Sequence, residues 1–596
     1  MKTRNDILRR NPRAFTVVSA LLGIAISALV LVPIFGLIPR VFFVDGEWQG
    51  EAFSETWTRS GILPMLAHTL LLAGAGTLLA VVIGSTFAWL AERTDAGMGW
   101  VTRALPIIPM MVPPLAGTIG WVLLLTPGPG MINTILRRAG DLFGFEMGTS
   151  GPINIFSWYG LLFVYTIYLV PHVFLTVSAG LRNLDPSLEE ASRVSGANPL
   201  GTLIRVTLPA VLPSVGAGAL LALVIGVSMF ATPFILGTPA GIDVLAVSIV
   251  RLTSFRYPAE LDVAVVLGIV MVVIVGGAWL LQRWMMSRQR HATIGGKGGR
   301  VAIVRLGRWR KGGARLLMVG YLLASSAIPF LALLVVSLQP FWGAAIRLDS
   351  LSFGNYRSVL FESGLLSNGF RNSVGLGAVG ATVAMVSAAL IVYYIRFNPR
   401  NPVARLADGV TKLPAVLSHV VVGMAMIAVF AGPPFNLAGT LLILLLGYYV
   451  LYLPQATITA GDALGQIDVS LIEASQSSGA APGRTFGRVV LPLMRPGLVA
   501  GWIFVFVLMV GEVTASVMLA SSRTPVVGFV MIDMFNNGTY PALAAIGTVV
   551  SLLTSSVVLL VMFWPWDRAS RNGSRVARAA GARRPRESTA SIESAR

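Results

Sequence analysis

The sequence predicts an all-α membrane protein with about twelve transmembrane helices, arranged as two parallel repeats of six helices. Three observations lead to this prediction. First, 55% of the 596 residues are hydrophobic and only 12% are charged, whereas a soluble protein carries roughly a quarter charged residues. Second, apolar runs long enough to cross a hydrocarbon core of about 30 Å recur along the whole chain. Third, one polar segment of 25 residues occurs twice.

The apolar runs define twelve candidate spans, and proline or glycine within several of them predicts kinks. The spans are 15–37, 62–90, 104–126, 157–180, 211–237, 261–283, 316–338, 372–395, 413–431, 438–459, 496–520 and 541–564. The first run is too long for the apolar part of a secretory signal and lacks a small-residue cleavage site, so we interpret it as a membrane span. With the N-terminus in the cytoplasm, most of the 45 Lys and Arg residues are cytoplasmic. The positive-inside rule therefore predicts that both termini are cytoplasmic.

Basic stretches mark the organisation of the chain. After a cytoplasmic segment 1–13, we expect a first domain over 14–284, a basic cytoplasmic linker over 285–314 and a second domain over 315–565. The linker lacks acidic residues and has no G-x-x-x-x-G-K-[ST] phosphate-binding pattern, so we expect it to be flexible and to rest near anionic headgroups. The tail 566–596 is polar and basic and is predicted to be disordered in the cytoplasm. This placement of the net charge of +19 argues against a nucleic-acid partner.

Several kinds of chemistry are excluded by the composition. The chain has no cysteine, so disulfides and thiolate metal sites are absent. Its four histidines show no ligand spacing, and we expect no metal or cofactor to be bound by this chain. His172 and His419 lie in or near spans and are interpreted as interhelical hydrogen-bonding groups. Because no H-E-x-x-H, G-x-S-x-G or paired-acid pattern occurs, we predict no catalytic residues.

The duplicated segment shows how the two halves are related. Residues 185–209 align without a gap with residues 468–492, at an offset of 283, and 15 of the 25 positions are identical. Both copies fall on the predicted cytoplasmic side, between the fourth and fifth spans of each half. Since six spans separate equivalent points, the halves enter the membrane in the same orientation. They are therefore parallel repeats, related by a pseudo-twofold axis along the membrane normal.

Each copy of this segment has the pattern of a short exposed helix. Asp185 and Asp468 are suited to be N-caps, and a glycine follows each helix at a C′ position. One interpretation is an amphipathic connector on the bilayer surface, but the repetition favours a shared docking task for two equivalent partners or a partner dimer. The residues that we expect to take part are Glu190, Ala191, Ser192, Gly196, Leu208 and Pro209 in the first copy, and Glu473, Ala474, Ser475, Gly479, Leu491 and Pro492 in the second.

The pattern E-A-[AS]-x3-G-x9-[IV]-x-L-P, present in both copies, resembles the EAA loop of permease subunits of bacterial ABC importers of the type I, binding-protein-dependent class. Ser192 and Ser475 replace the second alanine. The resemblance implies that each loop is a coupling helix docked on one of two copies of a separate ABC ATPase subunit, which uses the ATP. It also implies an extracytoplasmic solute-binding protein, alternating access, and a place in the lipid of the bacterial inner membrane.

An acidic residue lies within the predicted eleventh span. A charge at the centre of a lipid-facing helix costs at least about 2.5 kcal/mol, so Glu512 is expected to face the bundle interior. Its equivalent in the first half is Met229. Glu512 and Met229 are therefore candidate residues of a translocation pathway. The alternative is that Glu512 forms a structural hydrogen bond, for example to Thr514 or Ser516.

The cargo is predicted from resemblance alone. Two fused permease halves resemble the ferric-iron branch of this class, and thiamine importers share the fusion. The segments around Glu512 and 230–237 resemble those of ferric, sulfate/molybdate and polyamine permeases. We therefore expect ferric iron as the cargo, with thiamine, polyamine, phosphonate or sulfate/molybdate as alternatives. An ion-coupled secondary transporter is the alternative from another class, and it predicts paired acids or broken helices at the midplane.

Overall fold

The computed structural model describes residues 12–44, 47–48, 50–99, 101–102, 105, 108–145, 148–287, 303–343, 348–362 and 364–563. Within these ranges, ten helices are long and apolar enough to cross a membrane, or up to twelve if each of two bent helix pairs is one span. The predicted all-α fold is therefore confirmed. Residues 1–11, the linker residues 288–302 and the tail from 564 lie outside the described ranges.

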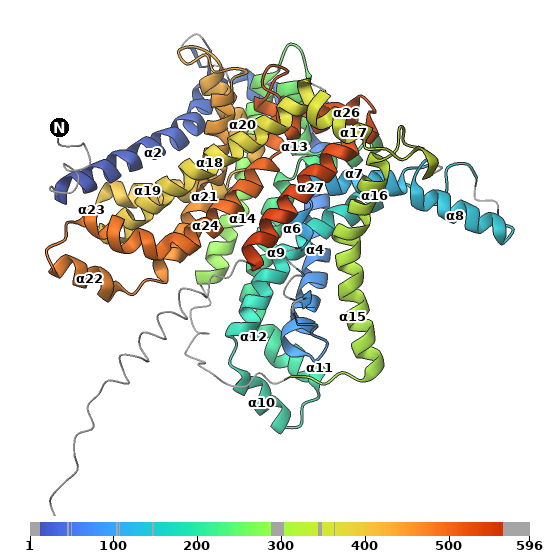
Figure 1. Ribbon diagram of the computed structural model, residues 1–596, viewed down its shortest axis with the longest axis horizontal. Helices are drawn as coiled ribbons and strands as arrows, with labels where there is room; N and C mark the ends of the chain where they lie inside the picture. Colours follow the sequence, from blue (N-terminus) through green and yellow to red (C-terminus); the bar gives the residue numbers. More distant parts are fainter. Residues whose placement is uncertain are drawn as a thin grey trace, which may run out of the picture.

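The first half is built from long apolar helices joined by short elements on both sides (Figure 1). Its long helices are α2 (Pro12–Phe42), α4 (Ile62–Arg93), α9 (Trp158–Asn183), α12 (Leu208–Ser228) and α14 (Leu261–Ser287). Its short elements are the antiparallel strands β1 (Phe43–Val44) and β2 (Glu47–Trp48), and the helices α3 (Glu51–Thr58), α6 (Ile108–Met111), α7 (Pro114–Leu125), α8 (Met131–Leu142), α10 (Pro186–Val194), α11 (Pro199–Thr202) and α13 (Leu245–Val250).

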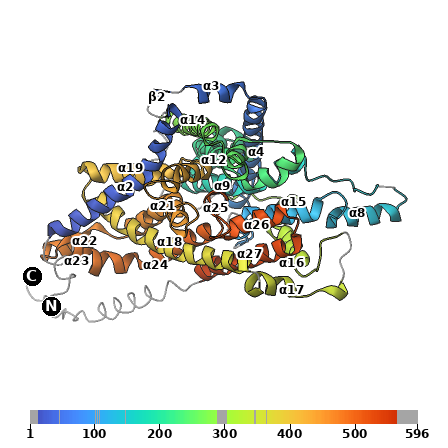
Figure 2. The ribbon, with the colours of Figure 1, turned by 90° about the horizontal axis from the view of Figure 1, so that it is seen from above.

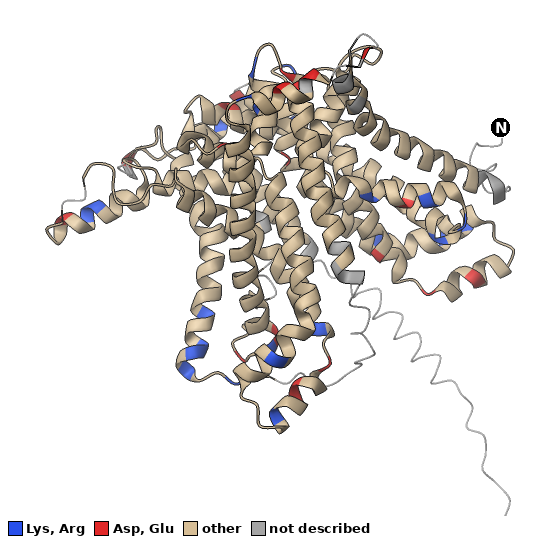
Figure 3. Ribbon diagram, turned by 180° about the vertical axis from the view of Figure 1, so that it is seen from behind, with Lys and Arg blue, Asp and Glu red and all other residues tan. Residues whose placement is uncertain are grey.

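The second half is also built from long helices joined by short ones. Its long helices are α15 (Arg308–Leu322) with its continuation α16 (Ile328–Ser337), α18 (Gly364–Phe397), α21 (Leu441–Gly465), α24 (Leu491–Val510) and α27 (Tyr540–Phe563). Its shorter helices are α17 (Gly354–Arg357), α19 (Pro402–Lys412), α20 (His419–Met426), α22 (Val469–Ser477), α23 (Pro482–Thr485), α25 (Thr514–Leu519) and α26 (Val527–Asn536). Charged residues gather near the helix ends and on the connecting segments, while the long middles of the helices carry few (Figure 3).

Two predicted spans are not continuous helices. In place of the span 413–431, the chain forms the helices Pro402–Ala415 and His419–Ala431, which are bent by 111° to one another. Ser418 caps the second of these helices by accepting a hydrogen bond from the Val420 N–H. Within the predicted span 104–126, the described residues form two shorter helices, α6 and α7. Helix α7 begins at a proline, a residue that favours the first turn.

Two further predicted spans end before their expected limits. The span predicted over 211–237 stops as α12 at Ser228, and the span predicted over 496–520 stops as α24 at Val510. The breaks fall at equivalent positions in the two halves. Met229 and Glu512 therefore lie at helix breaks and not, as predicted, inside a continuous span.

The first helix of each half packs on the opposite half. Helix α2 lies along α19 and contacts α18, as Figures 1 and 2 both show. Its Phe15 ring lies 5.8 Å from the Tyr393 ring and 5.6 Å from the Phe486 ring, measured between centroids. In turn, α16 packs against α7 of the first half, and the Tyr321 hydroxyl on α15 donates a hydrogen bond to the Ile167 carbonyl on α9 (3.0 Å). The two halves therefore share helices.

Gly120 provides a test of this exchange. A Cβ atom at position 120 on α7 would lie 2.5 Å from the Pro329 carbonyl oxygen on α16. Because two backbones meet there, we expect Gly120→Ala to cost about 1–3 kcal/mol and to lower the melting temperature of the purified protein. Gly74→Ala is the matched control, since nothing lies within 4 Å of a Cβ atom there. Equal melting temperatures for the two variants would contradict this packing.

The end of the predicted linker has a fixed structure, contrary to the expected flexibility. The Val304 N–H donates to the Arg93 carbonyl (2.8 Å), and the Asp95 N–H donates to the Val304 carbonyl (3.1 Å). The Asp95 carboxylate accepts hydrogen bonds from the Leu306 N–H (2.9 Å) and the Lys311 ammonium (3.0 Å). These contacts hold the pKa of Asp95 below its usual value. Helix α15 also begins inside the predicted linker. The contacts of Val304, Leu306 and Lys311 therefore join the start of the second half to the loop after α4.

Candidate functional site

Helices α10 and α22 occupy the two copies of the repeated segment, and we call them the coupling helices. Both protrude from the helix bundle (Figure 1). The Asp185 carboxylate accepts a hydrogen bond from the Ser187 N–H (2.9 Å), and Asp468 accepts one from the Ser470 N–H (2.9 Å). These bonds lower the pKa of both aspartates. The two predicted N-caps are confirmed.

Each coupling helix ends at the predicted glycine. Gly196 has a φ of +87° and Gly479 a φ of +82°, a left-handed conformation that costs other residues roughly 1–2 kcal/mol. The residue after each glycine closes the turn, because the N–H of Ala197 or Ala480 donates to a carbonyl in the last turn, 3.1 Å away in both copies. The predicted Leu-Pro pair starts the regular part of the next long helix in both halves, Leu208-Pro209 in α12 and Leu491-Pro492 in α24. The helical backbone itself already begins at Pro199 and Pro482.

The serine that replaces the second alanine of the motif has a structural role in both copies. The Ser192 hydroxyl lies 3.1 Å from the Thr202 hydroxyl, and the Ser475 hydroxyl lies 3.0 Å from the Thr485 hydroxyl. Both pairs fasten a coupling helix to the turn that follows it. The sequence analysis assigned these serines no contact, although the threonines at equivalent positions, Thr202 and Thr485, were a signal for this bond.

The remaining motif residues face outward. Glu190, Ala191, Glu473 and Ala474 are all exposed. Neither glutamate forms an ion pair with another described residue. Two carboxylates, each beside a small side chain, are therefore free to meet a partner on equivalent surfaces.

The buried acid of the first coupling helix was missed by the sequence analysis. Glu189 lies 2.9 Å from the Arg93 guanidinium, and each side chain is only 2% exposed. The Thr207 hydroxyl donates to Glu189 (2.7 Å), and Arg93 donates to the Leu181 carbonyl (2.7 Å). The ends of α4 and α9 are thus tied to α10 and to the start of α12. The equivalent residue in the second copy is Ile472, which is also buried. An apolar residue at this position of the second copy was the available signal that Glu189 is buried.

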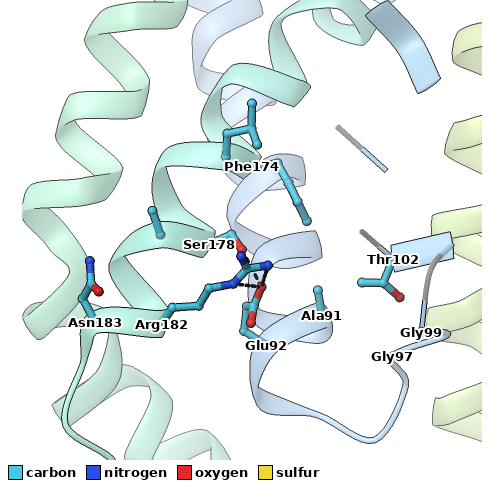
Figure 4. Close-up of a pocket in the computed structure, with 11 residues that line it drawn as sticks. Ala91, Glu92, Gly97, Gly99, Thr102, Phe174, Ser178, Arg182 and Asn183 are labelled. Carbon is cyan, nitrogen blue, oxygen red and sulfur yellow. Dashed lines mark hydrogen bonds and ion pairs between the residues drawn. The ribbon is translucent and has the colours of Figure 1, made fainter. Parts of the chain in front are cut away.

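A hollow of about 930 Å³ opens between α9, the end of α4 and the loop after α4. Figure 4 shows Glu92, Arg182 and Ser178 on its wall. The Arg182 guanidinium lies 2.7 Å from Glu92, and the Ser178 hydroxyl donates to the same carboxylate (2.5 Å). Since each of these charged groups has its partner, the cluster holds α4 and α9 together near the base of the first coupling helix.

A second cavity, the central cavity, lies between the two halves and has a volume of about 530 Å³. Residues of α7, α9 and α12 line it from the first half, and residues of α20, α21 and the α24–α25 break line it from the second. Met229 and Glu512 both belong to its wall. The structure therefore brings the two predicted pathway residues into one cavity.

The Glu512 carboxylate is held from three directions. His419 Nδ1 at the start of α20 lies 2.9 Å from Oε2, and the Tyr452 hydroxyl on α21 donates to the same oxygen. The Ala515 N–H donates to Oε1 (2.9 Å), so the carboxylate also caps α25. The alternative, a structural hydrogen bond of Glu512, is confirmed, but its side-chain partners are His419 and Tyr452. The suggested partners Thr514 and Ser516 are wrong for the carboxylate, since the Ser516 hydroxyl donates to the Glu512 carbonyl. His419 is an interhelical hydrogen-bonding group, as predicted.

Among the described residues, no group of three or more His, Asp or Glu side chains is placed to hold a metal ion.

Comparison with known proteins shows the family to which the chain belongs. Residues 80–291 and 380–565 match the binding-protein-dependent transport system inner membrane component. The chain belongs to this family. It is therefore a multi-pass permease of an ABC importer, with two permease domains fused in one chain. This membership decides against the ion-coupled secondary transporter, even though the broken helices which that alternative predicts are present.

Curated relatives of this permease differ in the share of the chain that they match. The ferric transport system permease protein FbpB of Actinobacillus pleuropneumoniae is 23% identical, over 92% of this chain and 78% of its own length. The Fe(3+)-transport system permease protein FbpB 2 of Haemophilus influenzae is 24% identical, over 81% of this chain and 97% of its own. The spermidine/putrescine transport system permease protein PotB of Escherichia coli is 27% identical but spans only 39% of this chain.

Proposed function

We propose that this permease imports ferric iron. The observation that carries the proposal is the length over which the relatives match. The two ferric permeases align with 92% and 81% of the chain, and therefore with both fused halves. The polyamine permease aligns with only 39% of the chain, which is less than one of the two halves. Thiamine, polyamine, phosphonate and sulfate/molybdate remain the alternative cargoes.

The permease works with separate subunits. Two copies of an ABC ATPase dock on α10 and α22, contact Glu190 and Glu473, and consume the ATP, so this chain is not an enzyme and binds no cofactor. An extracytoplasmic solute-binding protein delivers the cargo at the opposite face. Both termini lie in the cytoplasm, and the membrane is the bacterial inner membrane. The exposure of both glutamates supports this docking.

Transport follows from moving the two halves against each other. Closure of the ATPase pair displaces the coupling helices, and the bonds of Ser192 and Ser475 pass that displacement to α12 and α24. These two helices end at the wall of the central cavity, at Met229 and Glu512. We expect the cavity to open alternately to each side of the membrane, with Glu512 and Met229 lining the pathway.

Proteoliposomes that contain the permease, its ATPase and the binding protein test the proposal. We expect ferric iron to accumulate only when ATP and the iron-loaded binding protein are both present. A binding protein loaded with thiamine or spermidine is the matched control and should give no uptake. ATP-dependent uptake of one of these solutes, without uptake of iron, would refute ferric iron as the cargo.

A further inference from the structure

The central cavity is lined by polar groups that can bind a cation. These groups are the Glu512 carboxylate, the Tyr452 phenol, the His419 and His172 imidazoles, the Gln455 amide and the hydroxyls of Ser228, Thr514 and Thr554. Neither Lys nor Arg occurs among the described lining residues. Charges interact several-fold more strongly in a protein interior than in water. With His419 neutral, a cavity that holds one carboxylate and neither Lys nor Arg favours a positively charged guest over an anion.

Three of these donors converge on one point from three separate elements. His419 Nδ1 and the Tyr452 hydroxyl both meet Glu512 Oε2, while the Ala515 N–H fixes the other carboxylate oxygen. The Glu512 side chain is only 4% exposed, but 37% of the His419 side chain is exposed, and His419 lines the cavity. The cluster is thus preorganised by the second half and reachable from the cavity.

Two polar side chains lie beside the same cavity at symmetry-related positions. His172 in α9 and Gln455 in α21 are separated by the repeat offset of 283 residues, and both line the central cavity. Both side chains are polar, and together they place one neutral polar group from each half beside the cavity.

We propose that Glu512, His419 and Tyr452 form a transient binding site for a trivalent metal cation in transit. His172 and Gln455 complete the polar surroundings across the pseudo-twofold axis. This inference rests on the proposed function. Carboxylate and phenolate oxygens are hard ligands that suit a small, highly charged cation, and imidazole also binds iron. When the ion binds, the protons of the Tyr452 phenol and of His419 Nδ1, which both hydrogen-bond to Glu512 Oε2, pass to water in the cavity.

The small size of this donor set agrees with a site of passage. A carboxylate, a phenol and one imidazole leave several coordination positions of the metal to water. A transport site must bind its ion strongly enough to admit it and weakly enough to release it. Three protein donors, hydrogen-bonded to one another when the metal is absent, meet both requirements.

The test uses the complete transporter in proteoliposomes, with Fe³⁺ and the redox-inert Ga³⁺ as cargoes loaded on the binding protein. Glu512→Gln keeps the size of the side chain and its hydrogen-bonding oxygen but removes the charge. We expect uptake of both metals to fall at least about tenfold, measured at temperatures where the variant remains folded and still shows the ATP hydrolysis stimulated by the binding protein. The melting temperature should fall somewhat, because the Gln amide nitrogen replaces one of two oxygens that accept hydrogen bonds. Tyr452→Phe should lower uptake in the same way.

Ser516→Ala is the matched control. Its hydroxyl lies in the same cluster, 2.6 Å from the Tyr448 hydroxyl, but outside the cavity wall, so uptake should stay at the wild-type rate. If the wild type imports iron and Glu512→Gln imports it equally well, the inference is overturned and the proposed function stands. Loss of the stimulated ATP hydrolysis together with uptake would assign Glu512 a structural role and also overturn it. Failure of the wild type to import either metal would instead overturn the proposed function.

Discussion

Replacing Glu189 with alanine will destabilise the first coupling helix and uncouple ATP hydrolysis from transport. The Arg93 guanidinium is 2% exposed, and without Glu189 it would stay buried with no carboxylate. Removing one partner of a buried ion pair costs about 3–5 kcal/mol. We therefore expect a lower melting temperature and, at temperatures where the protein remains folded, ATP hydrolysis without a matching rate of uptake.

Two further variants separate this effect from the loss of any glutamate. Glu190→Ala removes the neighbouring, exposed carboxylate, so its effect on stability should stay within about 0.5 kcal/mol. The double variant Arg93→Met with Glu189→Leu removes both charges and should recover most of the lost stability, since apolar replacements of buried pairs are often neutral or better. A wild-type melting temperature for Glu189→Ala would contradict the role of the pair.

Replacing Glu190 and Glu473 together with glutamine will abolish ATP-driven uptake while leaving the permease folded. Each carboxylate is expected to meet a basic group of the ATPase, and truncating one partner of such a pair costs about 2–5 kcal/mol of docking free energy. The pseudo-twofold arrangement predicts that each single variant keeps part of the activity. The measurements are co-purification of the ATPase, uptake in proteoliposomes and the melting temperature of the permease.

Asp408→Asn is the control for this double variant. Asp408 is a partly exposed acid on α19 that pairs with Lys412 (2.6 Å) and lies outside both coupling helices, so its replacement should leave uptake unchanged. Full uptake and unchanged co-purification of the ATPase in the Glu190/Glu473 double variant would show that docking does not depend on these carboxylates.

The local features of the coupling helices were predictable, because their causes lie within a few residues. The Asp185 cap and the Gly196 turn each depend on backbone groups close by in the sequence. The repeat gave evidence that a single copy would not give. Equivalent residues at an offset of 283 show that the two coupling helices belong to two related halves of the chain.

The contacts that were missed join distant parts of the chain. Arg93 and Glu189 come from different helices, and so do His419 and Glu512, so neither sequence neighbourhood reveals the partner. Helix breaks were missed for another reason. Hydropathy remains high through Met229 and through the segment after Val510, so apolar composition alone does not show where the backbone leaves the helix. In both cases the deciding interactions depend on packing between helices.

The exchange of first helices has a consequence for biosynthesis. Helix α7 of the first half is covered by α16, which the ribosome makes only after the whole first half has entered the membrane. Until then, the surface around Gly120 faces lipid or the insertion machinery. The first half therefore completes its folding only when the second half arrives, and fusion of the halves in one polypeptide guarantees that the missing helix follows on the same nascent chain.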